Sequence, residues 1–479
     1  MCERVKQKKN FEFYAIVYIL VVSSVVFLQS IGRNMDELWK YNICQAIANG
    51  KRLYRDVSLV NTPLIYLIGA LFVKIHYSLI SFKILTVIMW TTMLSVFHLI
   101  ALKFNQSNLK ILAINLFFIL FCSIQNCICL CYNQAVLLAS LVIIYILLRD
   151  KISTANIFEI GLLNSLAILC KYSTGIVVCL CTIIVLFYKV KNKKENDDKK
   201  SIFAKIIIYF TGLIVPMIVF VLYLAANNSL LDFYRMTIVG AGKFKNNALS
   251  IQELIDNVYI LVFFAILLII PILIAIDVIK HKNFTKEKVL VVLFAVANFA
   301  AAYPMFDTAH FYQGFYILAL LIPVVKDEKK IKWEIVGATT CPIILIYLIG
   351  SGMAGDQLRR INGYGYVFTM DYTYNKFNKI EKFVSDNNGH VKIMDPYAAF
   401  YDISLDRYIK YEGCFLNGNL GEKTPAEAFE SIVDKEDVVL MRDKKDITNR
   451  QFPIEICDYI KSNYKKDGKI ECFNVYKKR

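Results

Sequence analysis

Residues 31–66 read IGRNMDELWKYNICQAIANGKRLYRDVSLVNTPLIY and directly follow the first long apolar run of the chain. The stretch is too polar to lie in the hydrocarbon core of a bilayer, where unpaired polar and charged groups are costly. It places an adjacent acidic pair, Asp36 and Glu37, where the chain leaves the membrane. The stretch therefore predicts a surface loop that begins with two carboxylates.

A helix is predicted to begin at Glu37 and to end at Asn49, where Gly50 supplies a C-terminal signal. Its apolar residues recur at helical spacing on one side. Its polar side carries Lys40, Asn42 and Gln45. We expect an amphipathic helix on the membrane surface, with the acidic pair at the N-terminal end, where the helix dipole favours ionised carboxylates. The alternative is that the pair only caps a surface helix.

The composition indicates a polytopic membrane protein. The chain has 479 residues, of which 57% are hydrophobic and 14% aromatic, and its mean hydropathy is +0.48. Repeated long uncharged runs at this level require a bilayer. The net charge of +16 comes largely from Lys and Arg in short loops between apolar runs. Positive-inside topology explains these loops, so no nucleic-acid partner is expected.

The apolar runs predict about 11–13 transmembrane helices. Residues 1–10 are basic, which places the N-terminus in the cytoplasm. The segment 63–80 is interrupted by Lys74 and His76, and it is interpreted as a juxtamembrane or re-entrant helix within the first outer loop, 31–80. The predicted spans are 11–30, 82–102, 109–125, 132–148, 156–170, 173–188, 202–224, 257–279, 288–303, 308–325 and 333–351. Eleven spans put the C-terminus outside the cell membrane.

The remainder, 352–479, is predicted to form a small extracytoplasmic α/β domain next to the membrane module 1–351. Its apolar runs are short and alternate between strand and helix periods. The predicted helices are 375–387, 425–433 and 453–463, and the predicted strands begin at Val391, Asp437 and Lys469. About 130 residues can bury a core of their own, so we expect this domain to fold as a unit.

The 13 cysteines do not indicate a disulfide framework or a metal site. Several lie inside apolar runs, where cysteine behaves as a small hydrophobic residue. Cys127, Cys129 and Cys131 alternate in NCICLCYN, which is not a C-x-x-C spacing and has no His or acidic residue beside it.

The first loop resembles that of the GT-C membrane glycosyltransferases, the class of the dolichyl-phosphate-mannose protein mannosyltransferases and the bacterial lipid A aminoarabinose transferase. The resemblance lies in an Asp-Glu pair after the first helix and in three short runs that follow it in order. These are Asp36-Glu37, Ala48-Asn49-Gly50, Tyr54-Arg55-Asp56 and Thr62-Pro63-Leu64. The resemblance implies catalytic roles for the acidic pair and donor-binding roles for Tyr54, Arg55 and Asp56.

A second point of resemblance is the run from Gly161, in which a helix rich in small residues ends at Lys171 and Tyr172 opens the next helix. The resemblance implies that the Lys171 ammonium, with Tyr172 beside it, binds the phosphate of a lipid-linked donor. A lysine between two helices can also simply extend to the membrane interface.

Three further residues are candidate contacts to the donor phosphate or sugar. Asp307 and His310 lie at the start of one apolar run, in FDTAHFYQGFY. The alternative to a binding role is a structural one, in which Asp307 caps the N-terminus of a helix and His310 lies at the membrane interface. Arg235, in the outer segment LLDFYRMTIVGAGKFKNN, is a second candidate phosphate contact.

The resemblance implies an inverting glycosyltransferase that moves a sugar from a polyprenyl-phosphate donor to a cell-envelope glycan, lipid or protein on the outer face. Asp36 would act as general base while a cation stabilises the departing phosphate. Some relatives have a second acid in the connection corresponding to 126–133, which here has none. No cofactor and no obligatory metal are therefore expected. The alternative is a divalent metal ion bound by Asp36, Glu37 and Asp56 alone.

The alternative is a flippase, a transporter or a ligase of lipid-linked oligosaccharides. A transporter predicts charged or helix-breaking residues near the bilayer midplane and a repeat between its halves. The sequence shows no such repeat. A ligase that uses a polyprenyl-diphosphate donor is a nearer alternative and stays open.

Overall fold

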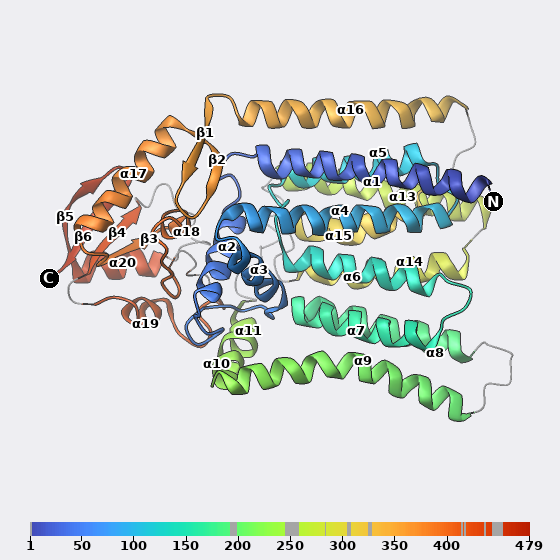
Figure 1. Cartoon of the computed structure of the whole chain (residues 1–479), viewed down its shortest axis with the longest axis horizontal. Coiled ribbons are helices and arrows are strands. Elements are labelled where there is room, and N and C mark those ends of the chain that lie inside the picture. Colours follow the sequence, from blue (N-terminus) through green and yellow to red (C-terminus); the bar gives the residue numbers. More distant parts are fainter. Residues whose placement is uncertain are drawn as a thin grey trace. The chain divides into compact units, whose positions relative to one another are not determined.

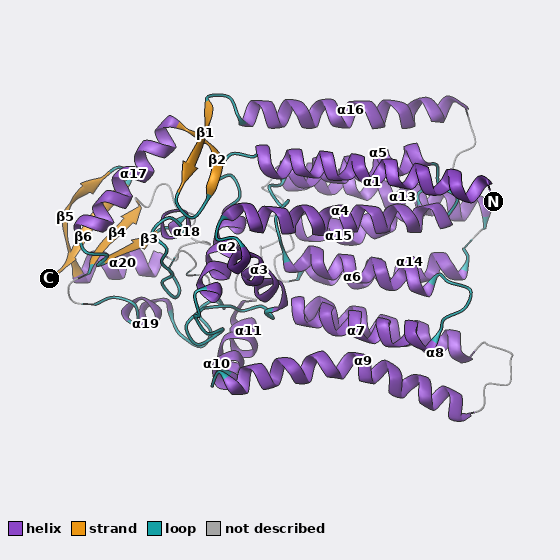
Figure 2. Ribbon diagram, in the orientation of Figure 1, coloured by secondary structure: helices purple, strands orange, loops and turns teal. Residues whose placement is uncertain are grey.

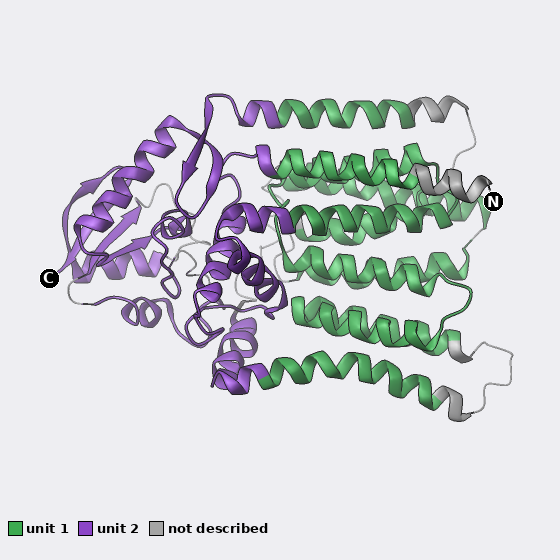
Figure 3. Ribbon diagram, in the orientation of Figure 1, with its two compact units in different colours: residues 1–26, 86–222, 248–348 green, residues 27–85, 223–247, 349–479 purple. Residues whose placement is uncertain are grey.

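The computed structural model describes residues 2–191, 199–244, 258–282, 284–303, 308–323, 328–412, 415, 418–434, 437–442 and 454–479. Helices dominate this part of the chain, and the strands gather toward its C-terminal end (Figures 1 and 2). The chain divides into two compact units (Figure 3), and each is described by itself. Unit 1 comprises 1–26, 86–222 and 248–348, and unit 2 comprises 27–85, 223–247 and 349–479.

Unit 1 is a bundle of apolar helices. Its helices, some of which extend a few residues into unit 2, are α1 (Cys2–Leu28), α4 (Leu79–Lys103), α5 (Asn108–Ile124), α6 (Tyr132–Leu147), α7 (Thr154–Cys170), α8 (Tyr172–Lys191), α9 (Lys199–Ala226), α13 (Val258–His281), α14 (Lys286–Phe299), η3 (Ala300–Ala302), α15 (Thr308–Leu318), η4 (Ala319–Leu321) and α16 (Glu328–Gly352). Every run that the sequence predicts as a span has a helix in this set.

Among the described residues, six helices are long and apolar enough to cross a membrane. Their apolar segments are Phe11–Leu28, Leu79–Lys103, Tyr172–Lys189, Phe203–Ala226, Ile260–His281 and Glu334–Gly352. Shorter apolar helices such as α5, α6 and α7 lie with them in unit 1. The polytopic membrane class expected from composition is confirmed.

Buried polar groups and close backbone contacts join the helices of unit 1. The Tyr316 hydroxyl donates to the side-chain oxygen of Asn115 at 2.8 Å, and the Asn115 amide donates to the carbonyl of Leu94 at 3.3 Å. Gly161 of α7 and Gly212 of α9 bring two backbones together, since a Cβ on either would meet a carbonyl oxygen of the other helix. Small residues and interhelical hydrogen bonds hold helices together where no hydrophobic force acts between them.

Unit 2 contains shorter elements. Its helices are α2 (Met35–Ala48), α3 (Leu64–Ile75), α10 (Leu230–Phe233), the π-helix η1 (Tyr234–Val239), α11 (Gly240–Phe244), α17 (Asp371–Asp386), α18 (Ala398–Asp402), α19 (Pro425–Glu430) and α20 (Ile454–Asn463). Its strands are β1 (Asp356–Ile361), β2 (Gly365–Met370), β3 (Val391–Met394), β4 (Val438–Arg442), β5 (Tyr464–Ile470) and β6 (Phe473–Lys478).

Helix α3 lies in segment 63–80, which the sequence predicts to be a juxtamembrane or re-entrant helix. It has 12 residues, so at 1.5 Å per residue it is roughly 18 Å long and too short to cross a hydrocarbon core of about 30 Å. It packs against α2 in unit 2 rather than joining unit 1. Helix α3 thus belongs to the same compact unit as α2.

The C-terminal part forms a four-stranded sheet of order β3-β4-β6-β5, in which β3 and β4 are parallel and the other pairs antiparallel. The predicted helices and the first two predicted strands are confirmed. The prediction of one continuous strand from Lys469 is wrong. The structure has two strands there, β5 and β6, because the chain turns between them at Glu471 (φ +50°). Strand β5 lies at the sheet edge and is mostly exposed and rich in lysine, so it shows no apolar alternation. The β1-β2 hairpin was also missed.

Candidate active site

The acidic pair lies in the first turn of α2, and its two carboxylates have opposite surroundings. The Asn34 side chain caps the helix by accepting a hydrogen bond of 3.1 Å from the backbone N–H of Glu37. The Asp36 side chain is 62% exposed and pairs with Lys40, with 2.9 Å between Oδ2 and Nζ. Glu37 is buried. Asp36 is therefore the member of the pair that a substrate can reach.

Glu37 lies under the influence of two buried lysines. Burial raises the pKa of Glu37 above its ordinary value, and the ammonium groups of Lys83 and Lys40 act against that rise. Lys40 therefore interacts with both carboxylates, by a direct ion pair with Asp36 and electrostatically with Glu37. Because Lys40 is only 2% exposed, its position is set by packing, and it fixes the position of the Asp36 carboxylate in turn.

The expectation that α2 is an amphipathic helix on the membrane surface is wrong. Its predicted polar side, Lys40, Asn42 and Gln45, is buried. The C-terminal part of unit 2 covers that side. The Asn42 amide donates to the carbonyl of Arg407 at 3.1 Å, and the Gln45 amide donates to the carbonyl of Ile403 at 3.2 Å. The polar residues bind backbone groups of a distant segment instead of water.

The Tyr54-Arg55-Asp56 run forms a tight turn after α2. Tyr54 is buried, has a φ of +65° and packs edge-on against Phe233, with ring centres 5.1 Å apart. Arg55 is exposed. Burial raises the pKa of Asp56, but hydrogen bonds from the backbone and guanidinium of Arg52 outweigh it and hold the pKa below its ordinary value. Asp56 is thus an ionised carboxylate that forms an ion pair with Arg52.

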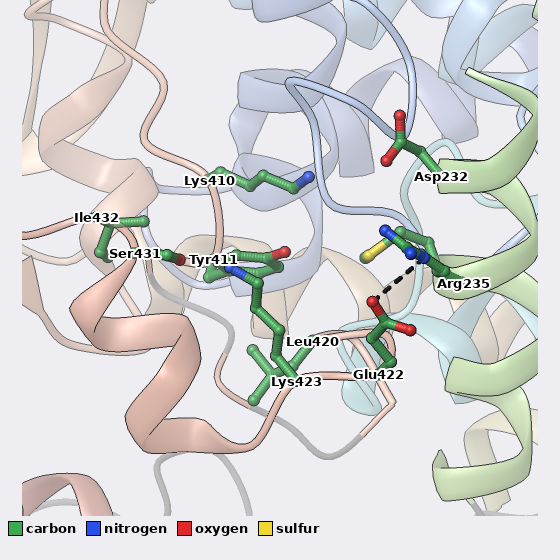
Figure 4. Close-up of a pocket in the computed structure, with 10 residues that line it drawn as sticks. Asp232, Arg235, Lys410, Tyr411, Leu420, Glu422, Lys423, Ser431 and Ile432 are labelled. Carbon is green, nitrogen blue, oxygen red and sulfur yellow. Dashed lines mark ion pairs between the residues drawn. The ribbon is translucent and has the colours of Figure 1, made fainter. Parts of the chain in front are cut away.

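A cavity of 310 Å³ opens beside this turn and contains the predicted residue Arg235 (Figure 4). Arg235 and Glu422 form an ion pair in its lining, with 3.2 Å between Nε and Oε1. Both side chains are about half exposed. The other lining residues are Asp232, Met236, Lys410, Tyr411, Leu420, Lys423, Ser431 and Ile432.

Lys410 connects the cavity to the Tyr54 turn. Its ammonium donates to the carbonyls of Tyr54 at 3.0 Å and Arg55 at 2.7 Å. Burial lowers the pKa of Lys410, and Asp232 acts against that change. Burial, with Asp232 and Glu422, raises the pKa of Tyr411 to about 12, so its hydroxyl stays protonated. The structure therefore brings Arg235 and the Tyr54 turn to one site.

Close backbone contact holds the cavity walls together. A Cβ on Gly240 would meet the carbonyl oxygen of Gly418, so α11 and the 418–421 turn approach without intervening side chains. The Lys243 ammonium also donates to the carbonyl of Glu422, at 2.5 Å.

The cavity has the chemistry of a polar, partly anionic ligand site. Three cations, Arg235, Lys410 and Lys423, stand beside two carboxylates, Asp232 and Glu422. Cations bind phosphates, and carboxylates accept hydrogen bonds from hydroxyl groups. Sequence reasoning found Arg235 but missed the residues from 410–432. The run RYIKYEG from Arg407, in which cations alternate with aromatic residues, was the available signal.

The candidates Lys171, Tyr172 and His310 belong to unit 1. The Lys171 ammonium donates to the side-chain oxygen of Asn133 at 3.0 Å and to the carbonyl of Ala301 at 2.8 Å. Lys171 is 7% exposed, so it is buried rather than extended to the interface. Tyr172 begins α8, and both it and His310 in α15 are half-buried. Asp307 lies outside the described residues.

Among the residues that the structure describes, no group of three or more His, Cys, Asp or Glu side chains is arranged to hold a metal ion. Asp36 pairs with Lys40, and Asp56 pairs with Arg52, at 3.1 Å between Oδ2 and Nε. Each carboxylate thus has a cationic side chain as a partner.

The fold is that of the GT-C membrane glycosyltransferases. No protein-family model and no curated protein matches the sequence. The similarity is to solved structures of ArnT, an aminoarabinose transferase, from Cupriavidus metallidurans. The apo structure matches with a TM-score of 0.55 and 9% identity over 99% of this chain and 98% of that one. A structure bound to undecaprenyl phosphate matches with a TM-score of 0.52 and 10% identity over 97% of each chain. The resemblance stated from the sequence is thus confirmed for the fold.

Proposed function

We propose that the chain is an inverting glycosyltransferase that moves a sugar from a polyprenyl-phosphate donor to an acceptor at the outer membrane face. The observation that carries the proposal is the accessible Asp36 carboxylate at the start of α2, in a chain with the GT-C fold along its length. A fold alone does not define a reaction, whereas an accessible carboxylate can accept a proton.

Asp36 is proposed as the general base. Its carboxylate would accept the proton of an acceptor hydroxyl as that oxygen attacks the anomeric carbon, and the bond from this carbon to the donor phosphate would break. A single displacement inverts the configuration at the anomeric carbon. Lys40, paired with Asp36 at 2.9 Å, would hold the carboxylate in position. Buried Glu37, whose pKa is raised, would act through Lys40 and not on the substrate.

The departing polyprenyl phosphate requires stabilisation of its charge more than protonation, because its conjugate acid is already strong. Lys171, with Tyr172 and His310 as further contacts, is the proposed donor-phosphate residue. Its ammonium is buried and held by two neutral oxygens, from Asn133 and Ala301, in a setting that strengthens its attraction for an anion. The undecaprenyl phosphate bound to one of the ArnT structures supports this class of carrier.

The cavity around Arg235 is the proposed contact for the polar part of a substrate. Arg235 and Lys423 would bind a phosphate or a sugar, and Asp232 and Glu422 would accept from hydroxyl groups. Tyr54 and Arg55 contribute backbone carbonyls that hold Lys410 at this site. An acceptor among cell-envelope glycans, lipids or proteins has the required groups.

The test is Asp36→Asn in the full-length protein in membranes, assayed with undecaprenyl-phosphate-linked hexose and pentose donors. Loss of a general base lowers kcat by about 10²–10⁴-fold. Binding of undecaprenyl phosphate should stay unchanged. The matched control is Glu455→Gln, which removes an exposed carboxylate from the first turn of α20. Full transfer by Asp36→Asn at normal expression would refute the proposal, and lipid translocation without transfer would favour the flippase.

A further inference from the structure

A second cavity lies in unit 1, and its lining includes none of the residues proposed for catalysis. Its volume is 620 Å³. It forms where α6 ends, α7 begins, α8 ends, and α9 and α14 begin. Helix α7 extends from this cavity to Lys171 and has 17 residues. At 1.5 Å per residue the two ends are roughly 25 Å apart, so the cavity lies at the opposite end of the helix from the proposed donor-phosphate residue.

The wall of the cavity is apolar and continuous with the surface of the bundle. Its apolar residues come mainly from the last turns of α6 and α8 and the first turns of α14. They are Leu147, Leu148, Ile152, Ile157, Ile184, Val185, Leu186, Val289, Leu290 and Leu293. Ile184 is 61% exposed, and the adjacent Phe187 is 65% exposed. In a bilayer, such side chains at the edge of a spanning helix contact acyl chains.

The rim of the cavity is cationic. Arg149, Lys189, Lys205 and Lys286 line it, against two carboxylates, Asp150 and Glu287. The Lys286 ammonium stands 5.5 Å from the centre of the Tyr188 ring. The Lys189 ammonium donates to the carbonyl of Leu147, where α6 ends. These charges lie at the ends of apolar helices, which is the level of the lipid headgroups.

We propose that this cavity binds an anionic glycerophospholipid, with its phosphodiester among the four cations and its acyl chains along the apolar wall. The excess of cations over carboxylates favours an anionic headgroup over a zwitterionic one. The long apolar wall favours a molecule with chains over free phosphate. The basic loops predict that this end of the helices faces the cytoplasm, where anionic lipid would stabilise the bundle independently of sugar transfer.

The test measures binding of fluorescent phosphatidylglycerol and phosphatidylcholine to the purified full-length protein. Phosphatidylglycerol should bind more tightly. The double variant Lys189→Gln/Lys286→Gln should bind it roughly 25-fold more weakly, because each cation near a headgroup contributes about a fivefold change. The matched control is Lys280→Gln/Lys282→Gln, which removes two exposed lysines, one in the last turn of α13 and one directly after it, that do not line the cavity. It should bind as the parent does.

A second variant tests the apolar wall without changing the charge. Val289→Trp would place a bulky side chain at the cavity, and we expect it to weaken phosphatidylglycerol binding by at least tenfold with an unchanged thermal midpoint. Glycerol phosphate should not displace the lipid. Parental binding by both variants, displacement by glycerol phosphate, or preference for undecaprenyl phosphate over phosphatidylglycerol would each overturn the proposal.

Discussion

Asp36 and Glu37 are neighbours in the chain, but the structure gives their carboxyl groups different surroundings. Asp36 lies at the exposed start of α2 beside Lys40, whereas Glu37 is buried. Burial disfavours the charged form of a carboxyl group, and this outweighs the opposite effect of Lys83 and Lys40 on the pKa of Glu37. The exposed member suits proton acceptance, and the buried one suits positioning.

Glu37→Gln should change how stability depends on pH. Since the pKa of Glu37 is raised in the folded protein, the folded state holds this proton more tightly than the unfolded state. The resulting stabilisation is present below the ordinary value of 4.5 and is lost as the pH rises through the raised pKa. The variant should match the parent near pH 4 and have the higher thermal midpoint near pH 8. Parallel midpoint curves over this range would contradict the assignment.

Arg407 stabilises two buried carboxyl groups in the C-terminal part of unit 2. Its Nε lies 2.5 Å from Oδ1 of Asp402, and its Nη2 lies 3.9 Å from Oε2 of Glu412. Burial raises the pKa of both carboxyls, and the Arg407 guanidinium acts against that change. Arg407→Leu should cost about 3–5 kcal/mol of stability, because it removes the cationic partner from a buried ion pair with Asp402.

Thermal unfolding of the full chain in detergent measures this effect. Lys379→Ala is the control, because it removes an exposed ion pair with Glu471 and should leave the midpoint unchanged. Adding Asp402→Asn to Arg407→Leu should recover part of the loss. A midpoint for Arg407→Leu equal to that of the parent would exclude this role.

At the scale of elements, α2 connects the first loop to the C-terminal part of the chain. Its Asn42 and Gln45 side chains bind the carbonyls of residues 407 and 403. The Tyr41 hydroxyl donates to the carbonyl of Gly363 at 2.9 Å. An element that appears amphipathic in sequence is therefore covered on both sides.

Asn42→Leu/Gln45→Leu should loosen the 403–407 segment. Each carbonyl left buried without its donor costs about 1–3 kcal/mol. We expect faster proteolysis of the C-terminal part and a lower thermal midpoint. Lys382→Ala on the exposed side of α17 is the control. Unchanged proteolysis of the double variant would show that these hydrogen bonds do not hold the segment.

At the scale of the whole molecule, unit 2 combines three separate segments of the chain. The predicted soluble domain 352–479 is part of this unit, together with α2, α3 and the 223–247 segment. Lys410, Tyr411 and Glu422, which line the Arg235 cavity, come from the C-terminal segment. The cavity therefore requires that segment.

A chain ending at Gly352 should keep the spanning helices of unit 1 but lose sugar transfer. It lacks the carbonyls of Ile403 and Arg407, which accept hydrogen bonds from α2. It also lacks the residues between 410 and 432 that line the Arg235 cavity. We expect faster hydrogen exchange in α2 and transfer below detection in membranes. A chain lacking only the exposed Lys478 and Arg479 is the control. Transfer at the parental rate by the shortened chain would contradict this dependence.

The sequence by itself determined that the chain is a polytopic membrane protein, the positions of its long apolar helices and the location of the acidic pair. Hydropathy and helical period are local properties, and long apolar runs have few alternatives in a bilayer. The same local reasoning placed α2, α17 and β3. It failed at β5, because an exposed edge strand shows no apolar alternation.

Only the tertiary structure decided which side of α2 is buried, which carboxylate is exposed and which residues surround Arg235. The buried side of α2 and the surroundings of Arg235 depend on contacts between residues more than 180 positions apart, such as Asn42 with Arg407 and Arg235 with Glu422. A single sequence holds no record of such pairs, because the free energy that selects them arises only when the separate segments pack together.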